Sequence, residues 1–143
     1  MRTRPTGRPT LKRFGTFSAT ALALTLCAAA LASTTLAGTY NATITRAGAL
    51  NGSWSMTFKG SAYTIAFKGA TAVKGVIAQS GNRLTFADRS GRYACAAKGV
   101  YTYSLSGRTL TFKAVSDPKC PGRRVVLAAR FTKKFSTSSN GSY

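Results

Sequence analysis

Apolar and polar side chains alternate along this chain, and the alternation constrains its fold more than any other feature. The clearest runs are 54–58, 63–67 and 101–105, in which every second residue is bulky and apolar. A period of two places successive side chains on opposite faces of a β-strand, and one apolar face per strand is typical of an antiparallel sheet. We expect no helix after residue 32. The predicted strands lie near 39–46, 53–59, 62–68, 72–79, 82–88, 97–106, 108–116 and 124–135.

Short turns containing glycine separate these runs. Gly60-Ser61, Ser80-Gly81-Asn82 and Ser106-Gly107-Arg108 are typical of tight hairpins between neighbouring strands. Strands joined by hairpins in chain order form a meander, and closing the meander removes both of its aggregation-prone edges. We therefore predict an all-β, eight-stranded, antiparallel up-and-down barrel. A two-sheet sandwich is the alternative, but it needs longer crossovers than these loops provide.

The first 32 residues have the three parts of a secretory signal peptide. Five basic residues and no acid precede residue 14, and a stretch rich in Ala and Leu runs from Ala19 to Ala32. This stretch is shorter than the roughly 20 residues that span a bilayer, so we favour a cleaved signal over a membrane anchor. Cleavage is expected after Ala32, with Ala37 as the alternative. The protein would then be periplasmic, at the cell surface or extracellular, with a barrel domain at 33–135 and a disordered polar tail at 136–143.

Removal of the signal peptide discards Cys27 and leaves Cys95 and Cys120. Two thiols in an exported chain are most simply joined, so we expect one structural disulfide between them. The alternative is a redox or metal site. It has little support, because there is no Cys-x-x-Cys spacing and no histidine to complete a zinc shell.

The chain has 21 Lys and Arg residues, no His, no Glu, and only two acids, Asp88 and Asp117. Most enzymes use a group that titrates near neutrality or carboxylates that share a proton or hold a metal. We therefore expect a non-enzymatic protein without metal or cofactor, and a monomer. Asp117 is expected to pair with Arg123 or Arg124, and Asp88 to hold a turn. Nothing in the sequence places the two carboxylates together.

The positive charge suggests anionic partners. Sixteen of the basic residues and both acids follow residue 32, which gives the mature chain a formal charge of +14. Such a surface attracts polyanions, among them lipid head groups, cell-wall polymers, acidic polysaccharides and extracellular nucleic acid. No nucleic-acid module is visible and the cations are spread along the chain, so we expect diffuse charge and no specific nucleic-acid site.

The apolar faces of the strands supply a candidate barrel interior. It would either bind a small hydrophobic ligand, such as a lipid, quinone or pigment, or be filled by its own side chains. Tyr63, Tyr101 and Tyr103 are the candidate polar contacts, because a buried tyrosine hydroxyl needs a partner. The expected interior residues are Trp54, Met56, Phe58, Tyr63, Ile65, Phe67, Leu84, Phe86, Tyr101, Tyr103, Leu105, Leu110, Phe112, Leu127 and Phe131.

The stretch Leu36-Ala37-Gly38-Thr39-Tyr40-Asn41 resembles the first strand of lipocalins and related calycins, with Tyr40 in place of the family's tryptophan. In that family an arginine from the end of the barrel packs over this aromatic ring, and Arg130 is the best match. The stretches 99–107, 110–112, 117–120 and 127–130 look like a group of exported bacterial lipocalin-like proteins. That group has no settled activity to carry over. Streptavidin-like barrels also begin with Gly-Thr-aromatic, but their pocket needs several tryptophans and this chain has one.

Overall fold

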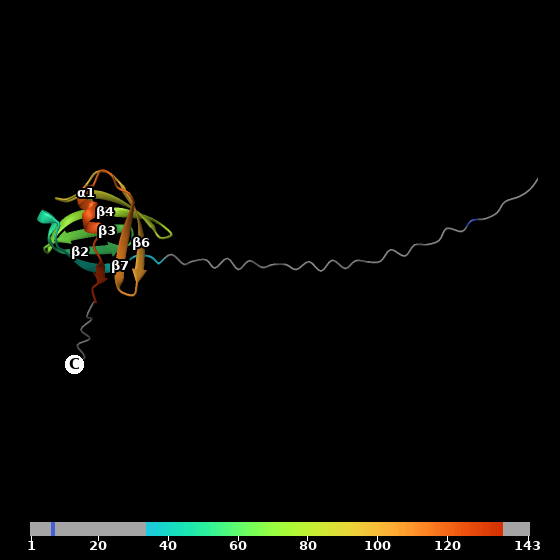
Figure 1. Ribbon diagram of the computed structural model, residues 1–143, viewed down its shortest axis with the longest axis horizontal. Helices are drawn as coiled ribbons and strands as arrows, with labels where there is room; N and C mark the ends of the chain where they lie inside the picture. The colour runs from blue at the N-terminus through green and yellow to red at the C-terminus, as the bar shows by residue number, and fades with distance from the viewer. Residues whose placement is uncertain (1–6, 8–33, 136–143) are drawn as a thin grey trace, which may run out of the picture. The chain divides into compact units, whose positions relative to one another are not determined.

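The computed structural model describes Gly7 and residues 34–135 of the 143-residue chain. Apart from Gly7, the predicted signal peptide lies outside the described residues, as does the predicted polar tail (Figure 1). Within residues 34–135, no helix has both the length and the hydropathy needed to cross a membrane.

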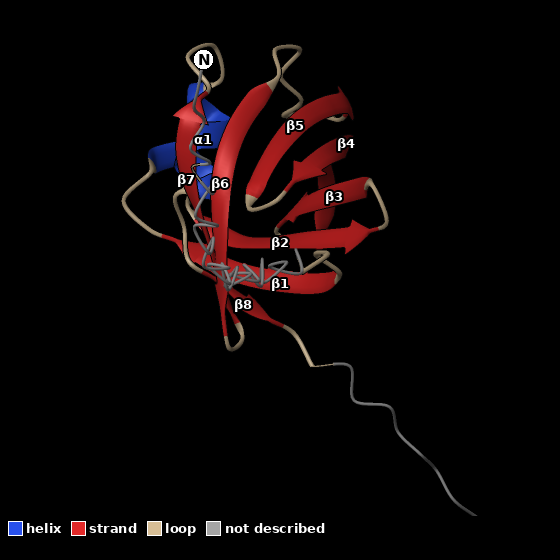
Figure 2. Cartoon of the chain, turned by 90° about the vertical axis from the view of Figure 1, so that its right-hand side faces the viewer, coloured by secondary structure: helices blue, strands red, loops and turns tan. Residues whose placement is uncertain are grey.

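Eight antiparallel strands form a closed barrel, which confirms the predicted fold class (Figure 2). Each strand pairs with the next one in the chain, and β1 pairs with β8 to close the cylinder, with Tyr40 opposite Lys133. A single 3-10 turn, η1 (Gly48–Leu50), lies between the first two strands. The strands are β1 (Gly38–Ile44), β2 (Gly52–Lys59), β3 (Ala62–Phe67), β4 (Ala70–Ser80), β5 (Arg83–Ser90), β6 (Gly99–Ser106), β7 (Thr109–Ser116) and β8 (Phe131–Lys133).

The predicted hairpins connect β2 to β3, β4 to β5 and β6 to β7. Each contains a glycine at positive φ, 59° at Gly60 and Gly81 and 57° at Gly107. The primed turns that suit two-residue hairpins require this conformation, which glycine adopts without steric cost. The local turn chemistry thus fixes the register of three strand pairs.

The expectation of a strand throughout 124–135 was wrong in its first half. A helix, α1 (Pro121–Leu127), occupies that part, and β8 (Phe131–Lys133) contributes only three residues to the barrel. Val125, which alternates with Val126 in the predicted strand, is 40% exposed on this helix. The expectation that no helix would follow residue 32 was wrong for the same segment.

The helix forms because this segment satisfies a helical pattern as well as an alternating one. Arg123, Val126 and Leu127 are its buried residues, at the i, i+3 and i+4 spacing of one helical face. Pro121 occupies the start of the helix, where its fixed φ is favourable and its missing N–H is not needed. The helix packs beside β7 at one end of the barrel (Figure 2).

Aromatic rings fill the middle of the barrel. Phe86 makes edge-to-face contacts with Tyr63, Tyr101 and Phe112, with ring centroids 5.2–5.7 Å apart. Phe112 in turn packs against Phe131. Of the fifteen expected interior side chains, eleven are buried, and the partly buried ones are Phe67, Tyr103, Leu105 and Phe112. The centre of the barrel is therefore a packed core.

The residues that precede β1 belong to the barrel. Leu36 is only 1% exposed and packs within the core. The backbone carbonyl of Thr34 accepts hydrogen bonds from the Gln79 amide, at 3.0 Å, and from the Tyr103 hydroxyl, at 2.7 Å. Residues 34–36 are thus tied to β4 and β6 by side chains of both strands.

The cation that lies over the first-strand aromatic is Lys133. Its Nζ is 5.9 Å from the centre of the Tyr40 ring, and it pairs with Tyr40 across the β1–β8 seam. Arg130, to which the lipocalin resemblance assigned this role, is exposed and precedes β8. The short β8 explains the difference, because residue 130 lies outside the strand.

Candidate functional site

Both carboxylates of the chain meet at one guanidinium group. Arg123, on α1, donates from Nε to Asp117 Oδ2 and from Nη2 to Asp117 Oδ1, each at 2.7 Å. Its Nη1 lies 3.3 Å from Oδ1 of Asp88, which is on β5. The two acids were not expected to be close. The structure brings them together because α1 places Arg123 between the end of β5 and the residues after β7.

Two tyrosines complete this buried group. The Tyr63 hydroxyl donates a hydrogen bond to Asp88 Oδ1, and the Tyr101 hydroxyl donates one to Asp117 Oδ2. We call these five residues, Asp88, Asp117, Arg123, Tyr63 and Tyr101, the carboxylate cluster. Its charged side chains are 5% exposed at Arg123, 2% at Asp88 and 0% at Asp117. Ion pairs this deeply buried are held by hydrogen bonds to both charges as well as by attraction.

The loop that follows β5 is attached to the cluster through its backbone. The amide of Cys95 donates to Asp88 Oδ2 at 2.8 Å, and the carbonyl of Ala97 accepts from Arg123 Nη2 at 2.6 Å. Asp88 was expected to hold a turn from within a loop. It lies in β5 instead, with its side chain buried, and it orders the later part of that loop.

Two glycines make room for the cluster. Gly75 on β4 lies in register between Tyr63 on β3 and Asp88 on β5. A Cβ atom at Gly75 would be 2.6 Å from the Tyr63 hydroxyl oxygen, and one at Gly99 would be 2.7 Å from Asp117 Oδ2. The absence of a side chain at Gly75 lets Tyr63 reach across one strand to the carboxylate.

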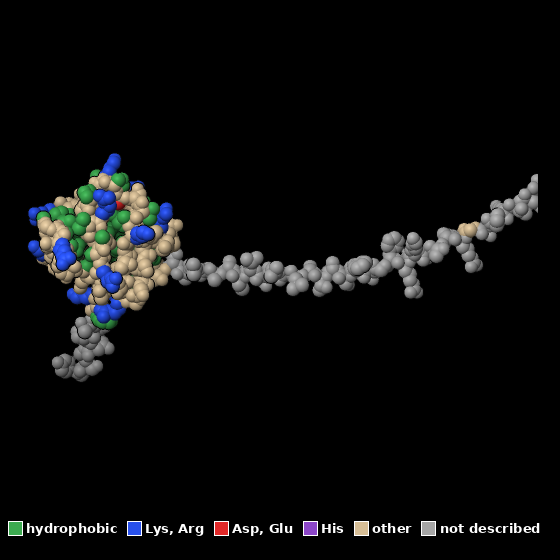
Figure 3. Space-filling view, in the orientation of Figure 1, with side chains coloured by type: hydrophobic (Ala, Val, Ile, Leu, Met, Phe, Trp, Pro, Cys, Tyr) green, Lys and Arg blue, Asp and Glu red, His purple; other side chains and the backbone are tan. Residues whose placement is uncertain are grey.

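Burial of the cluster leaves a surface whose only charged side chains are cationic. Asp88 and Asp117 are the only acids of the chain, and the side chains of both are buried. Figure 3 shows Lys and Arg side chains scattered over the visible face. In residues 34–135 the exposed cations are Arg46, Lys59, Lys68, Lys74, Arg83, Arg89, Arg92, Lys98, Arg108, Lys113, Lys119, Arg124, Arg130, Lys133 and Lys134.

The cluster shifts the protonation equilibria of its members. Burial alone would raise the pKa of Asp117, but hydrogen bonds from Arg123 and Tyr101 outweigh burial and hold the pKa below its usual value. Burial raises the pKa of both Tyr63 and Tyr101, and the hydrogen bonds that they donate to the carboxylates raise it further. The cluster therefore favours an ionised Asp117 and neutral tyrosines.

We expect thermal stability to fall below about pH 4 and above about pH 10. The pKa of Asp117 is lower in the folded state than in the unfolded state. Its contribution to stability is therefore complete above the unfolded-state pKa and is lost as the pH falls through the folded-state pKa. The tyrosine pKa values are raised, so their contribution is complete below about pH 10 and is lost as the pH rises toward the folded values.

Melting temperatures by circular dichroism across this range would test the expectation. The loss of stability at acid pH is easy to attribute, because the chain has only two side-chain carboxylates and the pKa of Asp117 is lowered by its hydrogen bonds. In Asp117→Asn the fall in melting temperature at acid pH should be smaller than in the native protein. Tyr101→Phe is the matched substitution for alkaline pH, where it should reduce the fall in melting temperature. A melting temperature that is constant down to about pH 2 would contradict the role assigned to the cluster.

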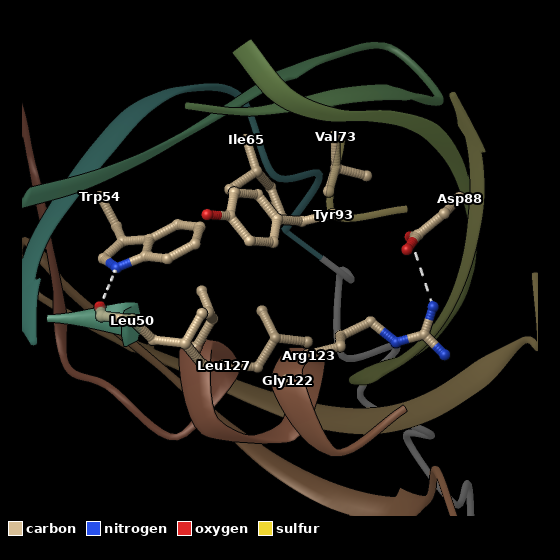
Figure 4. A pocket seen from close by; sticks show the side chains of 10 residues that line it. Leu50, Trp54, Ile65, Val73, Asp88, Tyr93, Gly122, Arg123 and Leu127 are labelled. Carbon is tan, nitrogen blue, oxygen red and sulfur yellow. Dashed lines mark hydrogen bonds and ion pairs between the residues drawn. The ribbon is translucent and has the colours of Figure 1, made fainter. Parts of the chain in front are cut away.

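A small cavity lies between the cluster and α1 (Figure 4). Its volume is about 60 Å³. Asp88 and Arg123 form its polar side, while the indole of Trp54 and the ring of Tyr93 lie toward the other end. The remaining lining residues are Leu50, Ile65, Val73, Gly122, Val126 and Leu127.

Few of the expected interior residues line this cavity. Trp54, Ile65 and Leu127 do, whereas most of the others pack in the ring-filled middle of the barrel. Tyr93 was not anticipated, because it lies in an irregular loop without alternation. It stands edge-on to Trp54, with ring centroids 6.1 Å apart, and is 37% exposed. Two sequence signals pointed to this end: the predicted Cys95–Cys120 disulfide and the predicted pairing of Asp117 with Arg123 or Arg124, and the structure has the disulfide and the Arg123 pair.

The described residues contain no group of three or more His, Cys, Asp or Glu side chains that could hold a metal ion. No protein-family model matches the sequence, and comparisons with curated proteins and with solved structures give no significant match. The closed eight-stranded antiparallel barrel is consistent with the lipocalin-like resemblance seen at Leu36–Asn41.

Proposed function

We propose that this protein is an exported, non-enzymatic, lipocalin-like barrel that binds anionic polymers or anionic surfaces through its exterior. One observation carries the proposal: both carboxylates are buried in the carboxylate cluster, so the exposed charged side chains of residues 34–135 are fifteen cations and no acid. Exposed cations on most proteins lie among exposed acids, which reduce the net potential. Here no exposed side-chain carboxylate of residues 34–135 competes with an external anion for these cations.

The packed core supports the exterior as the binding region. An interior ligand as large as a lipid or quinone usually needs a pocket of about 300–1,000 Å³. The cavity beside α1 is about 60 Å³, and aromatic rings occupy the centre of the barrel. A small hydrophobic ligand in the barrel is the second candidate. The cavity beside Trp54 favours it, although the volume restricts such a ligand to very few atoms.

One feature supports export, and a second bears on the position of the cleavage site. The Cys95–Cys120 disulfide is compatible with an oxidising compartment. Leu36 is part of the core, so cleavage after Ala32 would retain it, whereas cleavage after Ala37 would remove it. We therefore favour Ala32 as the last residue of the signal peptide.

Retention on anionic lipid vesicles and on a cell-wall phosphate polymer, measured as a function of salt, tests the proposed function. We expect strong retention at about 50 mM salt and a loss of affinity of about tenfold or more by 200 mM, because the attraction is between exposed charges. Vesicles of neutral lipid are the control surface. A triple change of Lys59, Lys68 and Lys74 to Gln should weaken retention, and the same three changed to Arg should not. Absence of retention at low salt would reject the proposal.

A further inference from the structure

One buried tryptophan connects three chain segments at the end of the barrel where β1, β3, β5 and β7 finish. The indole N–H of Trp54 donates to the carbonyl of Leu50 in η1, at 2.8 Å (Figure 4). Its ring stacks on Phe67, beside the β3–β4 turn, with centroids 4.4 Å apart. Tyr93, from the loop after β5, stands edge-on to both of these rings. Segments that are far apart in the sequence therefore form one continuous surface.

This surface presents apolar and aromatic side chains to solvent. Tyr93 is 37% exposed, and Leu50 and Phe67 are half-buried. The exposed backbone next to them carries small uncharged residues, Gly48-Ala49 in η1 and Gly69-Ala70 after the β3–β4 turn. A group of exposed apolar side chains often marks a site that contacts a membrane or another protein.

A cation lies over each of the two exposed rings. Lys68 Nζ is 5.0 Å from the centre of the Phe67 ring, and the guanidinium carbon of Arg92 is 5.4 Å from that of Tyr93. Long cationic side chains lay their stems along apolar surface and keep their charges in the polar medium. We call Leu50, Phe67, Lys68, Arg92 and Tyr93 the aromatic rim.

The backbone at this end holds cations in a conformation that disfavours them. Lys68 and Gly69 have φ values of 50° and 82°, as in a primed two-residue hairpin turn, whose first position favours Asn or Gly. The other described non-glycine residue at positive φ is Arg46, before η1, and it is also an exposed cation. Residues held in such conformations concentrate at functional sites, which supports a role for these charges.

An anionic bilayer suits the aromatic rim better than a polysaccharide does. A sugar packs on a free ring face, but Phe67 already has Trp54 stacked on it and Lys68 over it. Arg92 lies over the Tyr93 ring in the same way. A bilayer requires no such displacement, because aromatic side chains settle at the level of the head groups while Lys and Arg pair with the phosphates.

From these contacts we infer that the protein docks on an anionic lipid bilayer through the aromatic rim. Leu50 and Tyr93 lie at the level of the head groups, and Lys68 and Arg92 pair with lipid phosphates. The hairpins at the opposite end of the barrel stay in solution. This inference rests on the proposed function, because it names one anionic surface and the face of the barrel that contacts it.

Quenching of Trp54 fluorescence tests which face docks, since the only tryptophan of the chain lies directly beneath the aromatic rim. The probes are vesicles of equal parts phosphatidylglycerol and phosphatidylcholine, with or without bromine on the acyl chains near the head groups. Bromine quenches an indole only at short range. We expect a loss of Trp54 emission on the brominated vesicles at equal amounts of bound protein. Equal emission from both would place the bilayer against another face and overturn the inference.

Two charge-matched variants test the cations of the aromatic rim. Lys68→Gln with Arg92→Gln removes one lysine and one arginine from the rim. Lys59→Gln with Arg83→Gln removes the same two residue types from exposed positions beside the hairpins at the opposite end. A basic side chain at an anionic bilayer strengthens binding roughly fivefold, so the first pair should weaken vesicle binding about tenfold or more, and the second less than about threefold. Equal weakening would mean that total charge alone directs binding, and would overturn the inference.

A second pair of variants tests the aromatic contribution. Tyr93→Ser removes the exposed ring of the rim, whereas Phe135→Ser removes a ring that is 69% exposed and lies over Arg108 at the opposite end. We expect vesicle binding to weaken in the first and to be kept in the second, with melting temperatures measured to confirm that both variants fold. Weaker binding in Phe135→Ser alone would place the bilayer at the opposite end and overturn the inference.

The two proposals fail separately. Salt-dependent retention on anionic vesicles without quenching of Trp54 would keep the cationic exterior as the function and exclude the aromatic rim as the docking face. Retention on the cell-wall phosphate polymer with none on vesicles would have the same meaning. Quenching of Trp54 that does not change with salt would reject the electrostatic role and keep the aromatic rim as a membrane-contacting face.

Discussion

Replacement of Arg123 by Met will destabilise the barrel by about 3–5 kcal/mol, the usual effect of removing one partner of a buried ion pair. Methionine replaces the aliphatic part of the arginine side chain, so much of the apolar packing is kept. The main cost is that Asp88 and Asp117 are left buried without a counter-charge. Urea unfolding, with the midpoint and the slope both measured, gives the change in free energy of unfolding.

The neighbouring residue provides the control. Arg124 is exposed on the same helix, so Arg124→Met removes an identical charge but leaves the hydrogen bonds from Arg123 to Asp117 in place. We expect a change within about 0.5 kcal/mol, as for most surface substitutions. Equal effects of the two substitutions would mean that total charge, and not the buried ion pair, determines stability.

The pH dependence of Arg123→Met should also be inverted. Without the hydrogen bonds from the guanidinium, burial raises the pKa of the Asp117 carboxyl group above its unfolded value. A raised folded-state pKa stabilises the protein below the unfolded value, near pH 4, and this contribution is lost as the pH rises. The variant should therefore recover part of its stability on acidification, over the range in which the native protein begins to lose it.

The strands could be predicted from the sequence because their signal is local. A period of two, interrupted by turns such as Gly60-Ser61 and Gly81-Asn82, fixes both the strand positions and the pairing of neighbours. Closure follows from the pairing of β1 with β8, which buries the remaining edges. These features depend on residues close in the chain and required no knowledge of the site.

The carboxylate cluster could not be predicted in the same way, because it depends on long-range register. Asp88 and Asp117 are 29 positions apart, and Tyr63 reaches Asp88 only because Gly75 lies between them in the sheet. The connecting residue, Arg123, is on a helix. The sequence predicted a strand for this segment because apolar residues alternate at Val125, Leu127, Ala129 and Phe131. An apolar run this short fits either period, and tertiary packing decides between them.

Removal of the disulfide will cost about 3–4 kcal/mol in the chain-entropy description of its loop. The bond joins Cys95 to Cys120, which are 25 residues apart. A Cys95→Ala and Cys120→Ala double variant, compared with the native protein by urea unfolding, measures the cost without a reductant. A change below about 1 kcal/mol would mean that the unfolded chain already holds these segments together.

The disulfide should also be coupled energetically to the carboxylate cluster, because the two share a loop. The amide of Cys95 donates to Asp88, and Cys120 directly precedes the helix that carries Arg123. Once the bond is absent, the loop amide is held less firmly, so Asp88→Asn should cost less in the double variant than in the native protein. We expect a coupling of about 0.5–3 kcal/mol in a double-mutant cycle. Strictly additive effects would show that the bond acts on the unfolded chain alone. Coupling would mean that the bond also positions the backbone that keeps Asp88 buried.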